Sequence, residues 1–155
     1  MKITLIAVGK LKTAWWVAAQ KEYLERIRRY AALDIIEVKD RIGQGMADAA
    51  AVEKEGKDIL DAAAEASSII ALVPTGKALE SPAWADMLQK LSETYQRLAF
   101  VIGGPNGLSE AVLKKSRLQL SLSPMTFPHE LARVIFLEQL YRAFTILGRE
   151  KYHKA

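Results

Sequence analysis

The side chains best suited to proton transfer lie in the last third of this 155-residue chain. The sequence has only two histidines, His129 and His153, and both fall in that part. Histidine is the side chain whose charge changes most readily near neutral pH, so each is a candidate acid or base. Tyr152, next to the second histidine, offers an aromatic ring that could stack on an unpaired nucleic-acid base.

Further charged candidates lie within a strongly apolar segment, Glu130 to Leu147. Its apolar residues leave little of a helix circumference polar, so the helix must be buried on more than one side. In so small a protein, a second chain is expected to cover part of this helix. The apolar segment therefore predicts a subunit interface and a homodimer. Arg133, Glu138 and Arg142 would then lie at or near a buried surface, where they either form an Arg–Glu pair or bind a substrate.

A glycine-rich turn follows the apolar run Leu98 to Ile102. Glycines at 103, 104 and 107 would let the backbone approach a ligand closely, and Ser109 would start a helix with free N–H donors. The spacing is neither the dinucleotide pattern G-x-G-x-x-G nor that of a phosphate-binding loop. Taken alone, a tight turn with no ligand explains the segment equally well.

Two further turns strengthen the ligand interpretation, Leu72 to Lys77 and Leu122 to His129. The second mixes apolar residues with prolines and hydroxyls just before the apolar helix. Leu122, Met125 and Phe127 could enclose a flat adenine ring while the backbone supplies hydrogen bonds to its edge. The alternative is that these three residues belong to an ordinary core.

Alternating strands and helices must position these turns. The apolar and β-branched runs predict strands at 2–8, 34–38, 68–73, 98–102 and 117–122. Helices are expected at 14–30, 49–64, 81–96, after Ser109, and at 130–147, with Ser81 as an N-cap and residues 74–76 ending the third strand. This order predicts one α/β domain over residues 1–155 with a mostly parallel sheet. Ligands bind beyond the carboxyl ends of such strands, so the three turns should converge.

Composition excludes some classes of protein. The chain has no cysteine, so disulfides, thiolate nucleophiles and zinc ribbons are ruled out, and two isolated histidines do not predict a metal site. No apolar run is long enough to span a membrane and no signal peptide is evident, so a cytoplasmic location is expected. The net charge of +4 is mild and fits either an anionic partner or an ordinary basic enzyme.

Several motifs carry a family resemblance. They are I-G-G-x-x-G-L at 102–108, M-T-x-P-H-x-x-x-R-V-x-x-x-E-Q-x-Y-R-A at 125–143, the tail 152–154 and the opening 1–10. Together they resemble the ribosomal large-subunit pseudouridine N3-methyltransferases, which belong to the SPOUT class of knotted methyltransferases. The match is densest from Leu98 onward, and the length agrees end to end.

The resemblance implies a Rossmann-like parallel-sheet α/β domain with a C-terminal trefoil knot, which pattern rules would not have proposed. It also implies a homodimer that binds S-adenosylmethionine in the knot and methylates ring N3 of a pseudouridine in 23S rRNA within the ribosome. Cofactor-binding residues would be Leu72, Gly103, Gly104, Leu122, Ser123, Pro124, Met125, Thr126 and Phe127.

The implied reaction is an in-line displacement in which the protein supplies proximity and removes the N3 proton. Candidate bases are His129, His153 and Glu138, while Arg133 and Arg142 would hold the base or a phosphate and Tyr152 would stack on the target. If the last helix lies at the dimer interface, the tail could reach the other subunit's cofactor pocket.

Two positions depart from the family pattern. Val73 stands where an acidic residue is usual, and the loop Asp40 to Asp48 matches no known feature and is given no role. Three rival interpretations are a non-catalytic RNA-binding domain, a methyltransferase for another RNA, and a different nucleotide-cofactor enzyme.

Overall fold

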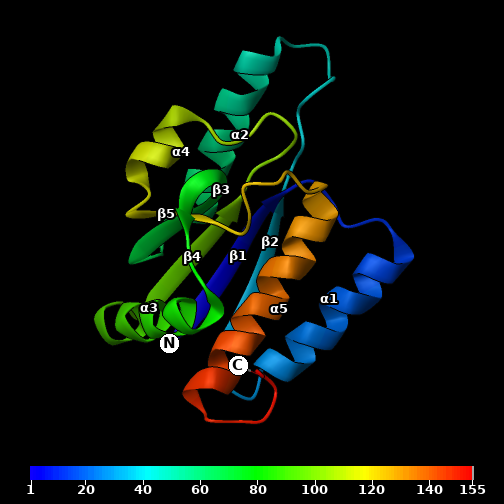
Figure 1. Ribbon diagram of the computed structural model, residues 1–155. Coiled ribbons are helices and arrows are strands. Elements are labelled where there is room, and N and C mark those ends of the chain that lie inside the picture. The colour runs from blue at the N-terminus through cyan, green and yellow to red at the C-terminus, as the bar shows by residue number, and fades with distance from the viewer. Residues whose placement is uncertain (155) are drawn as a thin grey trace.

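One five-stranded sheet, with all neighbouring strands parallel, organises the computed structural model, which describes residues 1–154 (Figure 1). The strand order is β2-β1-β4-β3-β5. The predicted α/β class is therefore confirmed. In chain order the elements are β1 Lys2–Val8, α1 Ala14–Ile27, β2 Ala32–Val38, α2 Asp48–Ala62, β3 Ser68–Ala78, α3 Ser81–Thr94, β4 Arg97–Ile102, α4 Glu110–Lys115, β5 Leu118–Ser121 and α5 His129–Leu147.

The third strand is longer than predicted. Residues 74–76 were expected to end it, but β3 continues to Ala78 after a register shift between Leu72 and Lys77, and both of these residues pair with Leu120 of β5. Gly76 permits this, because a Cβ there would lie 2.6–2.8 Å from backbone atoms of Gln119 and Leu120. A local pattern of Pro, Thr and Gly could not reveal a strand crossing from elsewhere in the chain.

Most helix ends differ from the predictions by one to three residues. α1 ends at Ile27 rather than Tyr30. Ser81 was predicted to cap α3, but Glu80 is the N-cap residue and no side chain caps this helix. The Ser81 hydroxyl instead donates to the side chain of Gln139 on α5, at 2.9 Å, and so helps to join α3 to α5. By contrast, Ser109 caps α4 as predicted and accepts the amide N–H of Val112.

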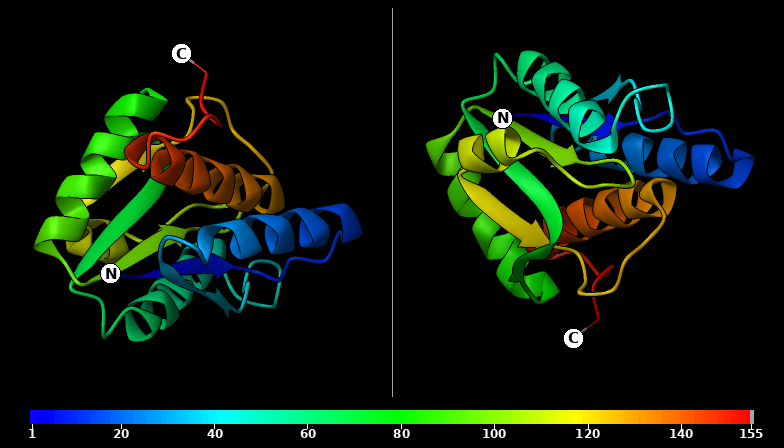
Figure 2. Two further views of the ribbon diagram at one scale, coloured as in Figure 1. Left: turned by 90° about the horizontal axis from the view of Figure 1, so that it is seen from below. Right: turned by 90° about the horizontal axis from the view of Figure 1, so that it is seen from above.

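Helices cover both faces of the sheet (Figure 2). α1, α5 and α3 lie side by side on one face, where the larger apolar core includes Phe100, Phe136 and Leu140. α2 and α4 lie on the other face over a smaller core around Ile6 and Val101. The carboxyl ends of all five strands therefore point to one edge of the sheet.

Helix α5 is covered more fully within one chain than its sequence suggested. It packs on the sheet between α1 and α3, and these neighbours account for much of its apolar circumference. A half-buried face remains, which includes Ile135, Glu138 and Arg142. The homodimer through this helix stays a prediction, as does the knot. Within residues 1–154, no helix is both long and apolar enough to cross a membrane.

Candidate functional site

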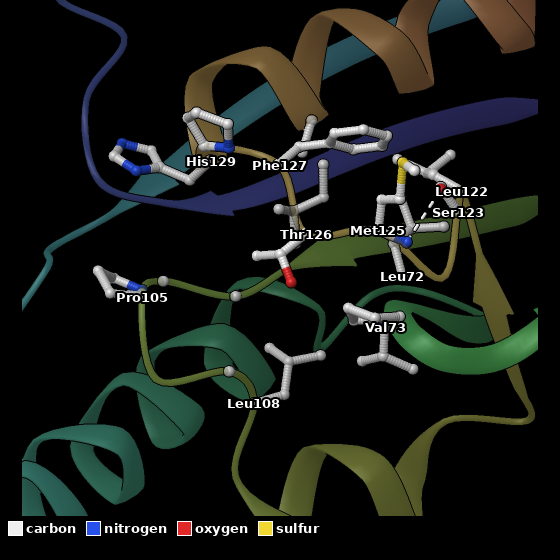
Figure 3. A pocket seen from close by; sticks show the side chains of 17 residues that line it. Leu72, Val73, Pro105, Leu108, Leu122, Ser123, Met125, Thr126, Phe127 and His129 are labelled. Atoms are coloured by element: carbon white, nitrogen blue, oxygen red, sulfur yellow. Dashed lines mark hydrogen bonds between the residues drawn. The ribbon is translucent and has the colours of Figure 1, made fainter.

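A cavity of about 570 Å³ lies at the carboxyl edge of the sheet. Its walls come from the three turns singled out in the sequence, which follow β3, β4 and β5, and from the start of α5 (Figure 3). These three strands are neighbours in the order β4-β3-β5, which brings their turns together. The predicted convergence of the three turns is confirmed. The lining residues are Leu72, Val73, Pro74, Ile102, Gly103, Gly104, Pro105, Gly107, Leu108, Leu122, Ser123, Met125, Thr126, Phe127, Pro128, His129 and Ala132.

Eight of the nine predicted cofactor residues line this cavity, all except Pro124. In the loop after β5, the Ser123 hydroxyl accepts the amide N–H of Met125 at 3.0 Å and folds the loop into a tight turn. Met125 remains 74% exposed at the mouth of the cavity. Leu72, Leu122 and Met125 gather at one end of the cavity, and His129 lies with Pro105 at the other (Figure 3).

Gly103 contributes a close backbone approach, but within the turn itself. A Cβ at this position would lie 2.8 Å from the carbonyl carbon of Gly107 and 3.0 Å from the Leu108 side chain. The sequence had suggested that a side chain here would fill the space of the ligand. In the structure it would instead force the turn open from inside. Gly107, with a φ of +79°, closes the same turn in the left-handed region that favours glycine.

The cavity is apolar and has no acidic lining. Val73, which replaces the usual acidic residue, is one of the lining residues. Polar groups come from the hydroxyls of Ser123 and Thr126, the imidazole of His129 and the turn backbones. Such a lining suits a flat, partly apolar ligand held by a few oriented polar groups. Among residues 1–154, no group of three potential His, Cys, Asp or Glu metal ligands occurs.

Arg133, one turn beyond His129, points into the protein interior and not into the cavity. Its side chain is fully buried, donates to Glu37 of β2 at 2.6 Å and to the carbonyl of Gly9 at 3.0 Å, and does not line the cavity. Burial raises the pKa of Glu37, but hydrogen bonds from Arg133 and the Leu11 amide outweigh it and lower that pKa overall. Arg133 therefore fixes the loop after β1 and has no surface left for a substrate in this chain.

The remaining predicted catalytic residues form a second group, here called the tail cluster: Glu138, Arg142, Tyr152 and His153. Two guanidinium nitrogens of Arg142 donate to Glu138 Oε1, and the Tyr152 hydroxyl donates to the same oxygen at 3.1 Å. A third nitrogen of Arg142 lies 3.3 Å from Nδ1 of His153. Because a guanidinium can only donate, Nδ1 accepts and the proton of the neutral ring is on Nε2.

Tyr152 is bound into the fold, although the tail was expected to contribute little to a core. Its ring packs against the larger core, lies 4.7 Å from the ring of Tyr141, and has the Arg142 guanidinium 4.8 Å from its centroid. Burial, with hydrogen bonding to Tyr23 and Glu138, raises the pKa of Tyr152 far above its usual value. The tail through Lys154 is thus not a frayed end; Ala155 lies outside the described residues.

The sequence analysis missed the support that α1 gives to this cluster. Tyr23 contacts Tyr152, and the Arg26 guanidinium lies 5.8 Å from the Tyr23 centroid and 5.5 Å from that of Tyr141. Glu37, the partner of Arg133, was missed as well. No local sequence pattern points to these contacts, because they join segments far apart in the chain. Glu37 and Arg133, for example, are 96 positions apart.

The cavity lies at the N-terminal end of α5, whereas the tail cluster begins with Glu138 at the middle of this helix and continues beyond its C-terminal end. His129 begins this helix, and Arg142 is thirteen residues further on. At 1.5 Å per residue the two are about 20 Å apart. One chain therefore brings His129 to the cavity but holds Glu138, Arg142, Tyr152 and His153 far from it.

Several solved structures share this fold. The chain is similar to a probable methylase family protein from Haemophilus influenzae Rd KW20, with 15% identity, a TM-score of 0.57, and coverage of 99% of this chain and 70% of that one. A probable methyltransferase from Bordetella pertussis Tohama I gives 14% identity, a TM-score of 0.56, and coverage of 92% and 95%. A protein from Legionella pneumophila, solved with bound cofactor SAM, gives 17% identity, a TM-score of 0.50, and coverage of 92% and 66%.

A family profile described as "Predicted SPOUT methyltransferase" matches residues 1–153, which is nearly the whole chain. The match includes the three turns of the cavity, helix α5 and the tail cluster through His153. This protein belongs to the SPOUT methyltransferase family.

Proposed function

We propose that this protein is an S-adenosylmethionine-dependent methyltransferase that modifies ring N3 of a pseudouridine in 23S rRNA, working on the ribosome in the cytoplasm. The observation that supports it most is the apolar cavity built by three strand-end turns in a chain of this family. The mild positive charge of +4 agrees with an RNA substrate.

The cavity fits the cofactor in size and chemistry. Its volume of about 570 Å³ lies within the usual range for small-molecule sites. Leu72, Leu122 and Phe127 would enclose the adenine, and the backbone of the turn at Gly103 and Gly104 would form one wall of the site. When bound, the cofactor supplies an already activated methyl group on its sulfonium. The protein's own share is then mainly positioning, worth about 7–11 kcal/mol for well-oriented reactants.

The substrate end of the site requires a second copy of the chain. Arg142 of the tail cluster lies about 20 Å along α5 from His129 at the cavity of its own chain. An antiparallel pairing of two α5 helices through their half-buried faces would set each tail cluster against the other chain's cavity. We therefore propose a homodimer with two composite sites, and light scattering at micromolar concentration should give twice the chain mass. A monomeric mass would contradict this.

The contacts divide the roles of the candidate bases. Glu138 is occupied by Arg142, Tyr152 and the side-chain amide of Gln139, so it orders the cluster. His153 presents an N–H at Nε2, which suits donation to a carbonyl of the target ring. His129 lines the cavity and is our choice for the base that takes the N3 proton. Tyr152 is only partly buried, so we propose that the exposed part of its ring contacts the target.

Mass spectrometry of ribosomal RNA from a deletion strain tests the substrate directly. We expect one methyl group to be lost from a single pseudouridine of 23S rRNA and to return when the wild-type protein is supplied. Loss from another RNA would favour a methyltransferase with a different substrate. Unchanged methylation in every RNA, with no binding of S-adenosylmethionine by calorimetry, would favour a non-catalytic RNA-binding domain. Binding of NAD instead would favour another nucleotide-cofactor enzyme.

A further inference from the structure

Glu55 of α2 is a buried carboxylate with an incomplete set of partners. The residue is 1% exposed. Oε1 accepts the amide N–H of Arg41 at 3.1 Å, while Oε2 is buried and has no hydrogen-bond partner among the described residues. Leaving such a group unpaired destabilises the folded protein, and more so when the group is charged. Packing alone would be served better by an apolar side chain.

Glu55 lies directly behind the wall of the cavity. A Cβ built on Gly104 would be 3.7 Å from Oε2 of Glu55, and Gly104 lines the cavity from the other side. Two contacts between α2 and the segment after β4 hold Glu55 close to Gly104. A Cβ on Gly56 would lie 2.1 Å from the Ser109 hydroxyl, and Asn106 donates to Asp48, the first residue of α2, at 3.0 Å.

The groups facing Glu55 come from the loop after β2 and from its own helix. The guanidinium of Arg41 donates to Asp58 at 2.9 Å and 3.2 Å. The backbone amide of Arg41 donates to Glu55. The pKa of Glu55 is raised overall, mainly because the residue is buried. The charges of Asp40 and Asp58 also raise this pKa, whereas the backbone amide and the charge of Arg41 lower it. The loop between β2 and α2, which the sequence left without a role, thus forms the charge environment of this carboxylate.

We propose that Glu55 is a specificity-determining residue that places a fixed negative charge behind the Gly103–Gly104 wall and so favours the sulfonium cofactor over its neutral thioether product. No acidic side chain lines the cavity, and Val73 occupies the place of the usual one. A buried negative charge attracts a nearby positive charge appreciably at an effective dielectric constant near 20, whereas the uncharged thioether feels no such attraction. Glu55 touches no ligand and acts through this field. The inference rests on the proposed cofactor.

Calorimetry with S-adenosylmethionine and S-adenosylhomocysteine tests it by the ratio of the two dissociation constants. Glu55→Gln keeps the shape and removes the charge, and should weaken binding of the sulfonium about fivefold with less than a twofold change for the thioether. Glu53→Gln, exposed on the same helix, is the matched control and should change neither. An equal loss for both ligands, or no loss, would overturn the proposal. Failure of the wild type to bind either ligand would instead overturn the proposed function.

The pH dependence of the wild type provides a second measurement. Glu55 is charged above its pKa, so the preference for the sulfonium should fall as the pH falls through that raised pKa. His129 also lines the cavity, so the variant is needed to isolate the part of the pH dependence that comes from Glu55. The part due to Glu55 is the part that Glu55→Gln abolishes. A wild-type preference that does not vary between pH 4 and pH 8 would contradict the assignment.

Discussion

The two ends of α5 are built on opposite principles. At its N-terminal end, the cavity has apolar walls from three loops, few polar side chains and no carboxylate lining. At its C-terminal end, Glu138, Arg142, Tyr152 and His153 hold one another in a network of hydrogen bonds and aromatic contacts. The first end can enclose a ligand but has a single ionisable side chain, His129. The second presents several hydrogen-bonding groups, and none of its four residues lines that cavity. On the proposed function, each end therefore supplies a different part of the active site.

Deleting the tail should separate the two ends most strongly. A chain that stops at Gly148 loses Tyr152 and His153 but keeps every lining residue of the cavity. Methyl transfer should fall by about 100-fold or more, the scale of general acid–base and positioning effects. Calorimetry should find cofactor affinity within about twofold of the wild type, because field and packing at the cavity are unchanged.

A mixing experiment sharpens this deletion. The truncated chain combined with a Gly103→Val chain should form heterodimers with one intact cavity facing one intact tail. Partial recovery of methyl transfer in the mixture supports composite sites. Full activity of the truncated chain alone would place the substrate site elsewhere, and no recovery from stable heterodimers would place tail and cavity in the same chain.

Gly103→Val should damage the cavity end alone. Its Cβ would lie within 2.8–3.0 Å of Gly107 and Leu108, so the turn must open. We expect cofactor affinity to fall by about tenfold or more, since over-packing costs about 1–3 kcal/mol. Gly45→Val is the control, because nothing lies within 4 Å of the new Cβ and the strain from its φ of +80° falls in the loop between β2 and α2. If both variants bind the cofactor equally well, the turn is not part of the cofactor site.

Tyr152→Phe should have a smaller effect at the other end. It keeps the ring beside Tyr141 and Arg142 and removes the hydroxyl that donates to Glu138 and contacts Tyr23. One hydrogen bond to a charged group is worth about 1.5–3 kcal/mol, so methyl transfer should fall roughly tenfold to 100-fold at an unchanged cofactor affinity. Tyr152→Ala should cost more, because the ring contacts are lost too. Equal rates for Phe and the wild type would show that only the ring matters.

Ser109→Ala should cause the smallest change. The substitution removes the N-cap of α4, which is worth about 1 kcal/mol, and leaves the cavity lining intact. Denaturant unfolding should show that loss, with methyl transfer within about twofold of the wild type. Ser116→Ala, at the other end of α4, serves as the comparison. A large loss of activity in Ser109→Ala would mean that the whole turn depends on this cap.

The turns that form the cavity could be predicted from the sequence, whereas the contacts behind these turns could not. Apolar runs ending in Gly, Pro and hydroxyl residues carry a local signal, and parallel strands force their turns to one edge. The pairs Arg133–Glu37 and Glu55–Arg41 carry none, because each joins segments that meet only after folding. Gly76 looked like a strand end for the same reason, since the strand that passes it is not visible in its neighbours. Tyr23 on α1 could have been found only by knowing that α1 and α5 lie side by side.

The length of α5 has a consequence for the amount of protein that a cell must keep. If a nineteen-residue helix separates the donor end from the acceptor end, isolated chains have no turnover at all. The rate is then second order in chain concentration wherever the dimer dissociates. Halving the supply of protein in that regime quarters the output. Modification of the substrate therefore has a threshold in expression level, although each chain is small and carries all the residues that the reaction needs.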